Sequence, residues 1–68
     1  MHNFLFEDHV NGGFFFVQCY TEQEAFEIVW EEIASDYGCC DRDNFCEYFD
    51  LIGCYADEDA EMMGYDTY

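Results

Sequence analysis

The chain has 68 residues, of which 17 are Asp or Glu and only one is Lys or Arg, so its net charge is −16. Direct binding to nucleic acid or to an anionic membrane surface is disfavoured, because both need Lys and Arg to neutralise phosphates. Aromatic residues make up 22% of the chain, which argues against an acidic disordered tail. The length predicts a single domain covering residues 1–68.

The first predicted element is an antiparallel β-hairpin with strands near residues 2–8 and 14–20. Both segments are rich in aromatic and other apolar residues. Between them, Asn11-Gly12-Gly13 supplies residues that accept a positive φ and therefore favour a tight turn.

An amphipathic helix is predicted over residues 22–36. Thr21 is a good N-cap, and Glu24 follows three residues later, as in a capping box. Gly38 is a plausible C-terminal stop. The apolar residues recur at helical spacing on one face, which we expect to cover the hairpin: Phe26, Val29, Trp30 and Ile33. If Trp30 is buried there, its replacement by Ala should cost about 3–5 kcal/mol.

Residues 45–55 admit a helix or a strand. Apolar residues at 45, 48, 49 and 52 repeat at helical spacing, and Gly53 supplies a stop. A strand would place Glu47 on one face and Asp50 on the other, so the helix over 45–52 is preferred and a third strand is the alternative. Residues 57–63 are predicted to form a short helix closed by Gly64, followed by a short tail.

These elements predict an α+β fold. An N-terminal antiparallel β-hairpin packs on an acidic amphipathic helix, and a second helix, or third strand, and a short C-terminal helix complete the domain. An isolated two-stranded hairpin has only marginal stability in water. The apolar face of the helix is therefore expected to pack on the hairpin and complete the hydrophobic core.

Regularly spaced carboxylates mark two predicted helices. On residues 22–36, one stripe lies opposite the apolar face and a second pair lies on its flank, while residues 57–61 form another cluster. Duplex DNA presents a similarly dense array, about one negative charge per 1.7 Å of axis. The predicted partner-binding residues are Glu24, Glu27, Glu31, Glu32, Asp36, Asp57, Glu58, Asp59 and Glu61.

Motifs for catalysis or cofactor binding are missing from the sequence. The five cysteines include no C-x-x-C pair, so reduced thiols are expected, with a zinc site or an oxidised pair as alternatives. The segment from Asp41 begins like a calcium loop but has Cys46 in place of Gly and Ile52 in place of Glu. We therefore expect no enzyme activity, no metal and no cofactor.

In size, charge and aromatic content the chain resembles small phage-encoded DNA-mimic inhibitors, which include acidic anti-CRISPR proteins, anti-restriction proteins and uracil-DNA glycosylase inhibitors. The resemblance is compositional and covers the whole chain. It implies a stoichiometric inhibitor that blocks the nucleic-acid site of a bacterial CRISPR effector, restriction enzyme or repair enzyme, with the anti-CRISPR role favoured. The implied location is the cytoplasm of the infected bacterial host, because residues 1–4 lack signal-peptide features and no apolar run is long enough to span a membrane.

Other functions stay open. An acidic adaptor would bind a basic protein without competing with nucleic acid. A metal or thiol module would use Cys39, Cys40 and Cys46 with the acidic loop. Adaptation to high salt would explain the acidity alone. A homodimer is compatible with the aromatic content, although the net charge opposes it.

Overall fold

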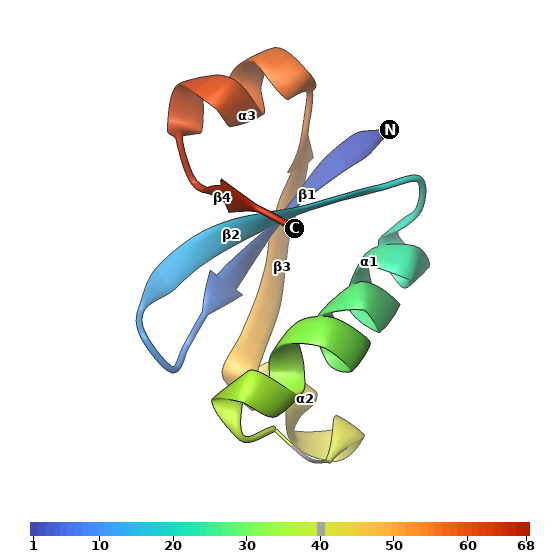
Figure 1. Ribbon diagram of the computed structural model, residues 1–68, viewed down its shortest axis with the longest axis vertical. Helices are drawn as coiled ribbons and strands as arrows, with labels where there is room; N and C mark the ends of the chain where they lie inside the picture. Colours follow the sequence, from blue (N-terminus) through green and yellow to red (C-terminus); the bar gives the residue numbers. More distant parts are fainter. Residues whose placement is uncertain (40) are drawn as a thin grey trace.

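The computed structural model describes residues 1–39 and 41–68, and it confirms the predicted hairpin. β1 (His2–Asp8) and β2 (Gly13–Cys19) pair antiparallel from end to end, from His2 opposite Cys19 to Asp8 opposite Gly13. Figure 1 shows the hairpin crossing the middle of the molecule.

The hairpin turn is held by a buried carboxylate. Asp8 accepts hydrogen bonds from the backbone N–H groups of Val10, at 2.8 Å, and Asn11, at 3.1 Å. Gly12 has a φ of 77°, a conformation that side chains with a Cβ rarely adopt. The turn therefore depends on Asp8, three residues before Asn11, as well as on the Asn-Gly-Gly signal itself.

Two further strands extend the hairpin into a sheet of order β3-β1-β2-β4. β3 (Phe49–Tyr55) runs antiparallel to β1, and β4 (Asp66–Thr67) runs parallel to β2. The helix preferred for residues 45–52 is thus wrong from residue 49 onward, and only α2 (Phe45–Tyr48) is helical. The strand alternative is confirmed for residues 49–55, and the predicted tail contributes a short strand.

The objection to a strand in this region does not apply, because β3 begins after Glu47. The exposed Glu47 belongs to α2, and burial alternates along β3 so that Asp50 is exposed. Further along the strand, Leu5 pairs with Gly53 but Phe6 pairs with Leu51, so Ile52 is an extra residue and forms a β-bulge. Neither carboxylate is buried.

One helical segment follows the hairpin with the predicted extent. It comprises α1 (Glu22–Ile28), a π-helical turn η1 (Val29–Ile33) and a 3₁₀ turn η2 (Ala34–Tyr37). The Thr21 hydroxyl accepts a hydrogen bond from the Glu24 backbone N–H at 3.1 Å, which confirms the predicted N-cap. Gly38, at a φ of 79°, ends the segment.

The buried face of this segment differs from the prediction. Val29 and Ile33 are buried as expected, but Phe26 and Trp30 are only half-buried. The remaining buried positions are the small Ala25 and Ala34. Small residues let the helix lie close to the sheet, so the two large aromatic rings lie at its flank, with centroids 5.9 and 6.4 Å from the ring of Phe45.

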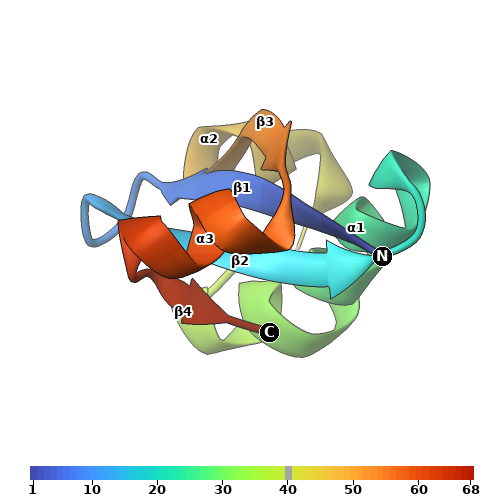
Figure 2. The same ribbon diagram turned by 90° about the horizontal axis from the view of Figure 1, so that it is seen from above.

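Helices cover both faces of the sheet. The main core lies between the sheet and the segment of α1, η1 and η2, and includes Phe6, Phe15 and Phe49. The predicted third helix is confirmed as α3 (Asp57–Met63), ended by Gly64. Figure 2 shows α3 in front of β1 and β2, on the side of the sheet away from α1. Beneath α3, the buried Phe16 contacts the ring of Tyr65.

The C-terminal residues are fixed to the sheet. The Tyr68 backbone N–H donates to the Phe16 carbonyl at 2.8 Å, and the Gln18 N–H donates to the Tyr68 carbonyl at 3.0 Å. Among the described residues, no helix is long and apolar enough to cross a lipid bilayer.

Candidate functional site

The carboxylates of α3 form an exposed acidic surface. Asp57, Glu58, Asp59 and Glu61 all have exposed side chains. Asp57 also anchors the helix, because the buried Asn3 side-chain amide donates to its carboxylate at 2.7 Å. Within residues 1–39 and 41–68, none of the four carboxylates forms an ion pair with a basic side chain.

A polar groove lies between α3 and the sheet. Its volume is about 430 Å³, and no basic residue lines it. The lining residues are Asn3, Gln18, Asp57, Ala60, Glu61, Gly64, Tyr65 and Thr67. Two carboxylates with neutral polar neighbours match the hydrogen-bonding needs of a guanidinium or ammonium group.

The acidic stripe predicted on α1 is interrupted by the one basic side chain. Glu24 and Glu31 are exposed, but Glu27 accepts a hydrogen bond from the Arg42 guanidinium at 2.8 Å. The guanidinium carbon lies 5.0 Å from the Trp30 ring centroid, within cation–π range. The hydrogen bond to Glu27 raises the pKa of Arg42, and the charges of Glu27 and Glu31 raise it further.

Arg42 belongs to the 3₁₀ turn η3 (Arg42–Asn44), fifteen residues beyond Glu27 in the chain. The helical spacing of Glu24, Glu27 and Glu31 describes only neighbours on one helix, so it could not reveal this partner. The stripe therefore includes a cation contact at Glu27 that the sequence analysis did not predict.

The nine predicted partner-binding residues fall into two groups. Five lie on the segment from α1 to η2, including the exposed Glu32 and Asp36, and four lie on α3. Figure 2 places the two groups on opposite sides of the sheet. They therefore form two acidic surfaces and not one continuous array.

An apolar cavity of about 220 Å³ lies beside α1 and is lined by Phe26, Glu27, Trp30, Arg42, Phe45 and Cys46. Pockets that enclose a small-molecule ligand usually measure about 300–1,000 Å³. This cavity is below that range.

The described cysteines are scattered. Cys19 and Cys39 are buried, Cys46 and Cys54 are exposed, and all four carry free thiols. Burial raises the pKa of Cys19. The predicted alternative of a thiol module also involved Cys40, which lies outside the described residues.

One group of metal-ligating side chains is found among residues 1–39 and 41–68: Glu7, His9 and Asp50. The hydrogen bond to Asp50 raises the pKa of His9, and the charges of Glu7, Asp50 and Asp8 add to this. The sequence prediction missed the group because His9 and Asp50 are 41 residues apart. Only the alternative prediction of a strand over residues 45–55 could have indicated this group, because a strand there can pair with β1 and bring Asp50 close to Glu7.

Comparisons with protein-family models, with curated proteins and with solved structures find no match to this chain.

Proposed function

We propose that this protein is a non-catalytic, stoichiometric inhibitor that mimics the charge of nucleic acid. It would block the basic DNA- or RNA-binding site of a bacterial defence protein in the cytoplasm of an infected host. A CRISPR effector is the favoured target, and restriction and repair enzymes are alternatives of the same class.

The observation that carries this proposal is the charge density of the folded domain. The net charge of −16 is held on a body that measures 34 Å along its longest axis. A DNA duplex of that length carries about 20 phosphate charges, at one per about 1.7 Å of axis. The domain and the duplex thus offer a basic groove comparable negative charge over a comparable length.

We place the first contact at α3. Its four carboxylates are exposed and form no ion pair within the described part of the chain, so they are available to Arg and Lys of a partner. A partner that binds Glu27 must first compete with Arg42. A basic side chain of the target would enter the polar groove beneath α3, where Asp57 and Glu61 flank it.

The test compares two variants that each remove three charges. One carries Glu58→Gln, Asp59→Asn and Glu61→Gln on α3, and keeps Asp57 because that carboxylate anchors the helix. The other carries Glu24→Gln, Glu27→Gln and Glu31→Gln on the helical segment from α1 to η1. Each tagged protein is used to capture binding proteins from a bacterial lysate, with washes of rising NaCl concentration.

We expect the wild type to retain a nucleic-acid-binding protein that dissociates as salt rises and cannot hold DNA while bound. Screening explains the salt effect, since the Debye length falls from about 10 Å at 0.1 M to about 3 Å at 1 M. The α3 variant should release the target at lower salt than the α1 variant does.

Two outcomes would contradict the proposal. If the retained protein still binds DNA, the chain is an acidic adaptor. If no basic protein is retained, charge mimicry is wrong and adaptation to high salt becomes the better explanation of the acidity.

A further inference from the structure

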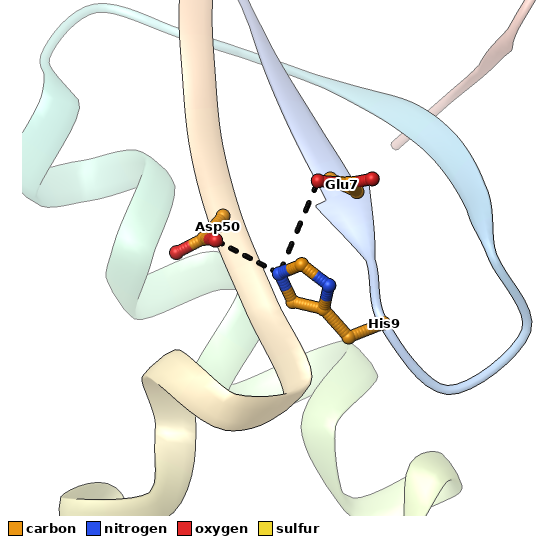
Figure 3. A group of neighbouring side chains, drawn as sticks. All are labelled: Glu7, His9 and Asp50. Carbon is orange, nitrogen blue, oxygen red and sulfur yellow. Dashed lines mark hydrogen bonds and ion pairs between the residues drawn. The ribbon is translucent and has the colours of Figure 1, made fainter.

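Three ligand-type side chains meet at one end of the hairpin. Glu7 comes from β1, His9 from the turn after it and Asp50 from β3 (Figure 3). The Nε2 atom of His9 lies 2.8 Å from Oδ2 of Asp50 and 4.0 Å from Oε1 of Glu7. One ligand atom of each residue lies within 4.8 Å of the other two.

The sheet register brings the two carboxylates together. Glu7 and Asp50 are direct partners across β1 and β3. Like charges directly opposite each other destabilise a sheet, so a positive charge nearby would stabilise this pair. Among the described residues, the imidazole of His9 contacts both carboxylates.

Hydrogen bonds hold the backbone around His9. The His9 backbone N–H donates to the carbonyl of Tyr48, the residue before β3, at 2.8 Å. Since the next two residues are bound to the carboxylate of Asp8, the turn on both sides of His9 is held. The backbone positions that carry the three side chains are therefore set by contacts that do not depend on a ligand.

We propose that Glu7, His9 and Asp50 form a binding site for a first-row transition-metal dication of the Mn²⁺ class. One imidazole nitrogen and two carboxylate oxygens make a mixed donor set that suits such ions, and thiolates are not needed.

The spacing of the donors fits this ion. Neighbouring donors that each bind one ion at about 2.0–2.2 Å lie about 2.8–3.6 Å apart at octahedral or tetrahedral angles. The observed distance of 2.8 Å lies at the lower end of this range, and the distance of 4.0 Å lies above it. Small side-chain rotations would bring all three donors onto one ion, because each side chain is at least 36% exposed. The same exposure leaves the remaining coordination positions to water.

The charges favour a dication over the alternative, which is a proton on His9. Two carboxylates carry two negative charges, and a protonated imidazole neutralises one of them. A dication neutralises both, and the net charge of −16 raises the concentration of dications near the surface. This site is independent of the proposed inhibitor function.

The test uses Mn²⁺ as a paramagnetic probe and two-dimensional ¹H–¹⁵N NMR spectra of the whole chain. At substoichiometric Mn²⁺, we expect amide signals of residues 7–11 and 49–51 to broaden first. Signals of α3 should stay sharp, although α3 carries more carboxylates. His9→Gln and Asp50→Asn should each raise the Kd for Mn²⁺ by about tenfold or more. Asp59→Asn, which removes an exposed carboxylate of α3, is the matched control and should leave the Kd unchanged.

Several outcomes would overturn the proposal. Broadening that begins on α3 or beside Cys46 and Cys54 would place the ion elsewhere. Broadening that survives both His9→Gln and Asp50→Asn would mean that Mn²⁺ is only a diffuse counter-ion. Both replaced side chains are exposed, and the metal-free spectra of the variants show directly whether the fold is kept.

Discussion

Aromatic side chains differ in how much stability their removal should cost, according to how deeply the fold buries them. Phe6 is fully buried, stacks on Phe15 at 5.6 Å and meets the edge of Phe26 at 5.4 Å. Trp30 lies half-buried at the helix flank between Phe45 and Arg42. By side-chain volume alone, Trp30 would contribute more to folding stability than Phe6. The lower burial of Trp30 reverses this order.

We therefore expect Phe6→Ala to lower the free energy of unfolding by about 3–5 kcal/mol, as for a buried Phe. Trp30→Ala should cost only about 2 kcal/mol, because the ring loses partial burial and one cation–π contact. Urea denaturation of the two variants measures both values. Equal losses would show that Trp30 is a core residue after all, as its spacing in the sequence had predicted.

For single side chains, the sequence predicts exposure well but not the contacts between residues far apart in the chain. The nine predicted partner-binding carboxylates are accessible, although Glu27 only partly, because charged residues seldom bury. The ion pair of Glu27 with Arg42 and the cluster of Glu7, His9 and Asp50 both join residues far apart in the chain. Periodicity describes neighbours on one element, so it gives no information on such contacts.

At the level of elements, the hairpin turn has a stabilising residue that its sequence signal does not include. Asp8 is 4% exposed and accepts hydrogen bonds from two backbone N–H groups, and a third reaches it from the Asn11 side chain at 3.3 Å. Its charge also contributes to the raised pKa of Tyr37, of which burial is the main cause.

Asp8→Ala should lower the free energy of unfolding by about 2 kcal/mol, because it leaves backbone donors of the turn without their partner. Asp59→Ala, at an exposed carboxylate, should change it by less than about 0.5 kcal/mol. Thermal and urea unfolding of both variants provide the check. If Asp59→Ala cost as much as Asp8→Ala, the turn contacts would not be the reason.

The elements that were predicted correctly carry local signals. The hairpin has Asn-Gly-Gly, the segment from residue 22 has Thr21 and Glu24, and α3 ends at a glycine. β3 and β4 have no such marker, because each is defined by pairing with a strand far away in the chain. The change from helix to strand at Phe49 and the bulge at Ile52 are likewise consequences of tertiary pairing and could not be derived from spacing.

For the whole molecule, the charge that the proposed function needs also opposes folding. Sixteen net negative charges repel one another more strongly in the compact state than in the expanded unfolded chain. The composition alone shows this total, but only the fold shows that the segment from α1 to η2 and helix α3, which carry the nine predicted partner-binding carboxylates, lie on opposite sides of the sheet (Figure 2).

Added NaCl should therefore raise the Tm, because screening weakens the repulsion between exposed charges. The variant with Glu58→Gln, Asp59→Asn and Glu61→Gln should start from a higher Tm and gain less from salt. Thermal unfolding monitored by circular dichroism between 0.05 and about 1 M NaCl tests both expectations. A Tm that falls or stays constant over this range would contradict them.

The contact between Arg42, Glu27 and Trp30 has a consequence for proteolysis. The chain has no lysine, so the bond after Arg42 is the only one in it that trypsin recognises. Its side chain is engaged by Glu27 and lies over the Trp30 ring, so it must leave both before it can enter a protease pocket. The rate at which trypsin produces two fragments therefore reports how often Arg42 leaves this contact.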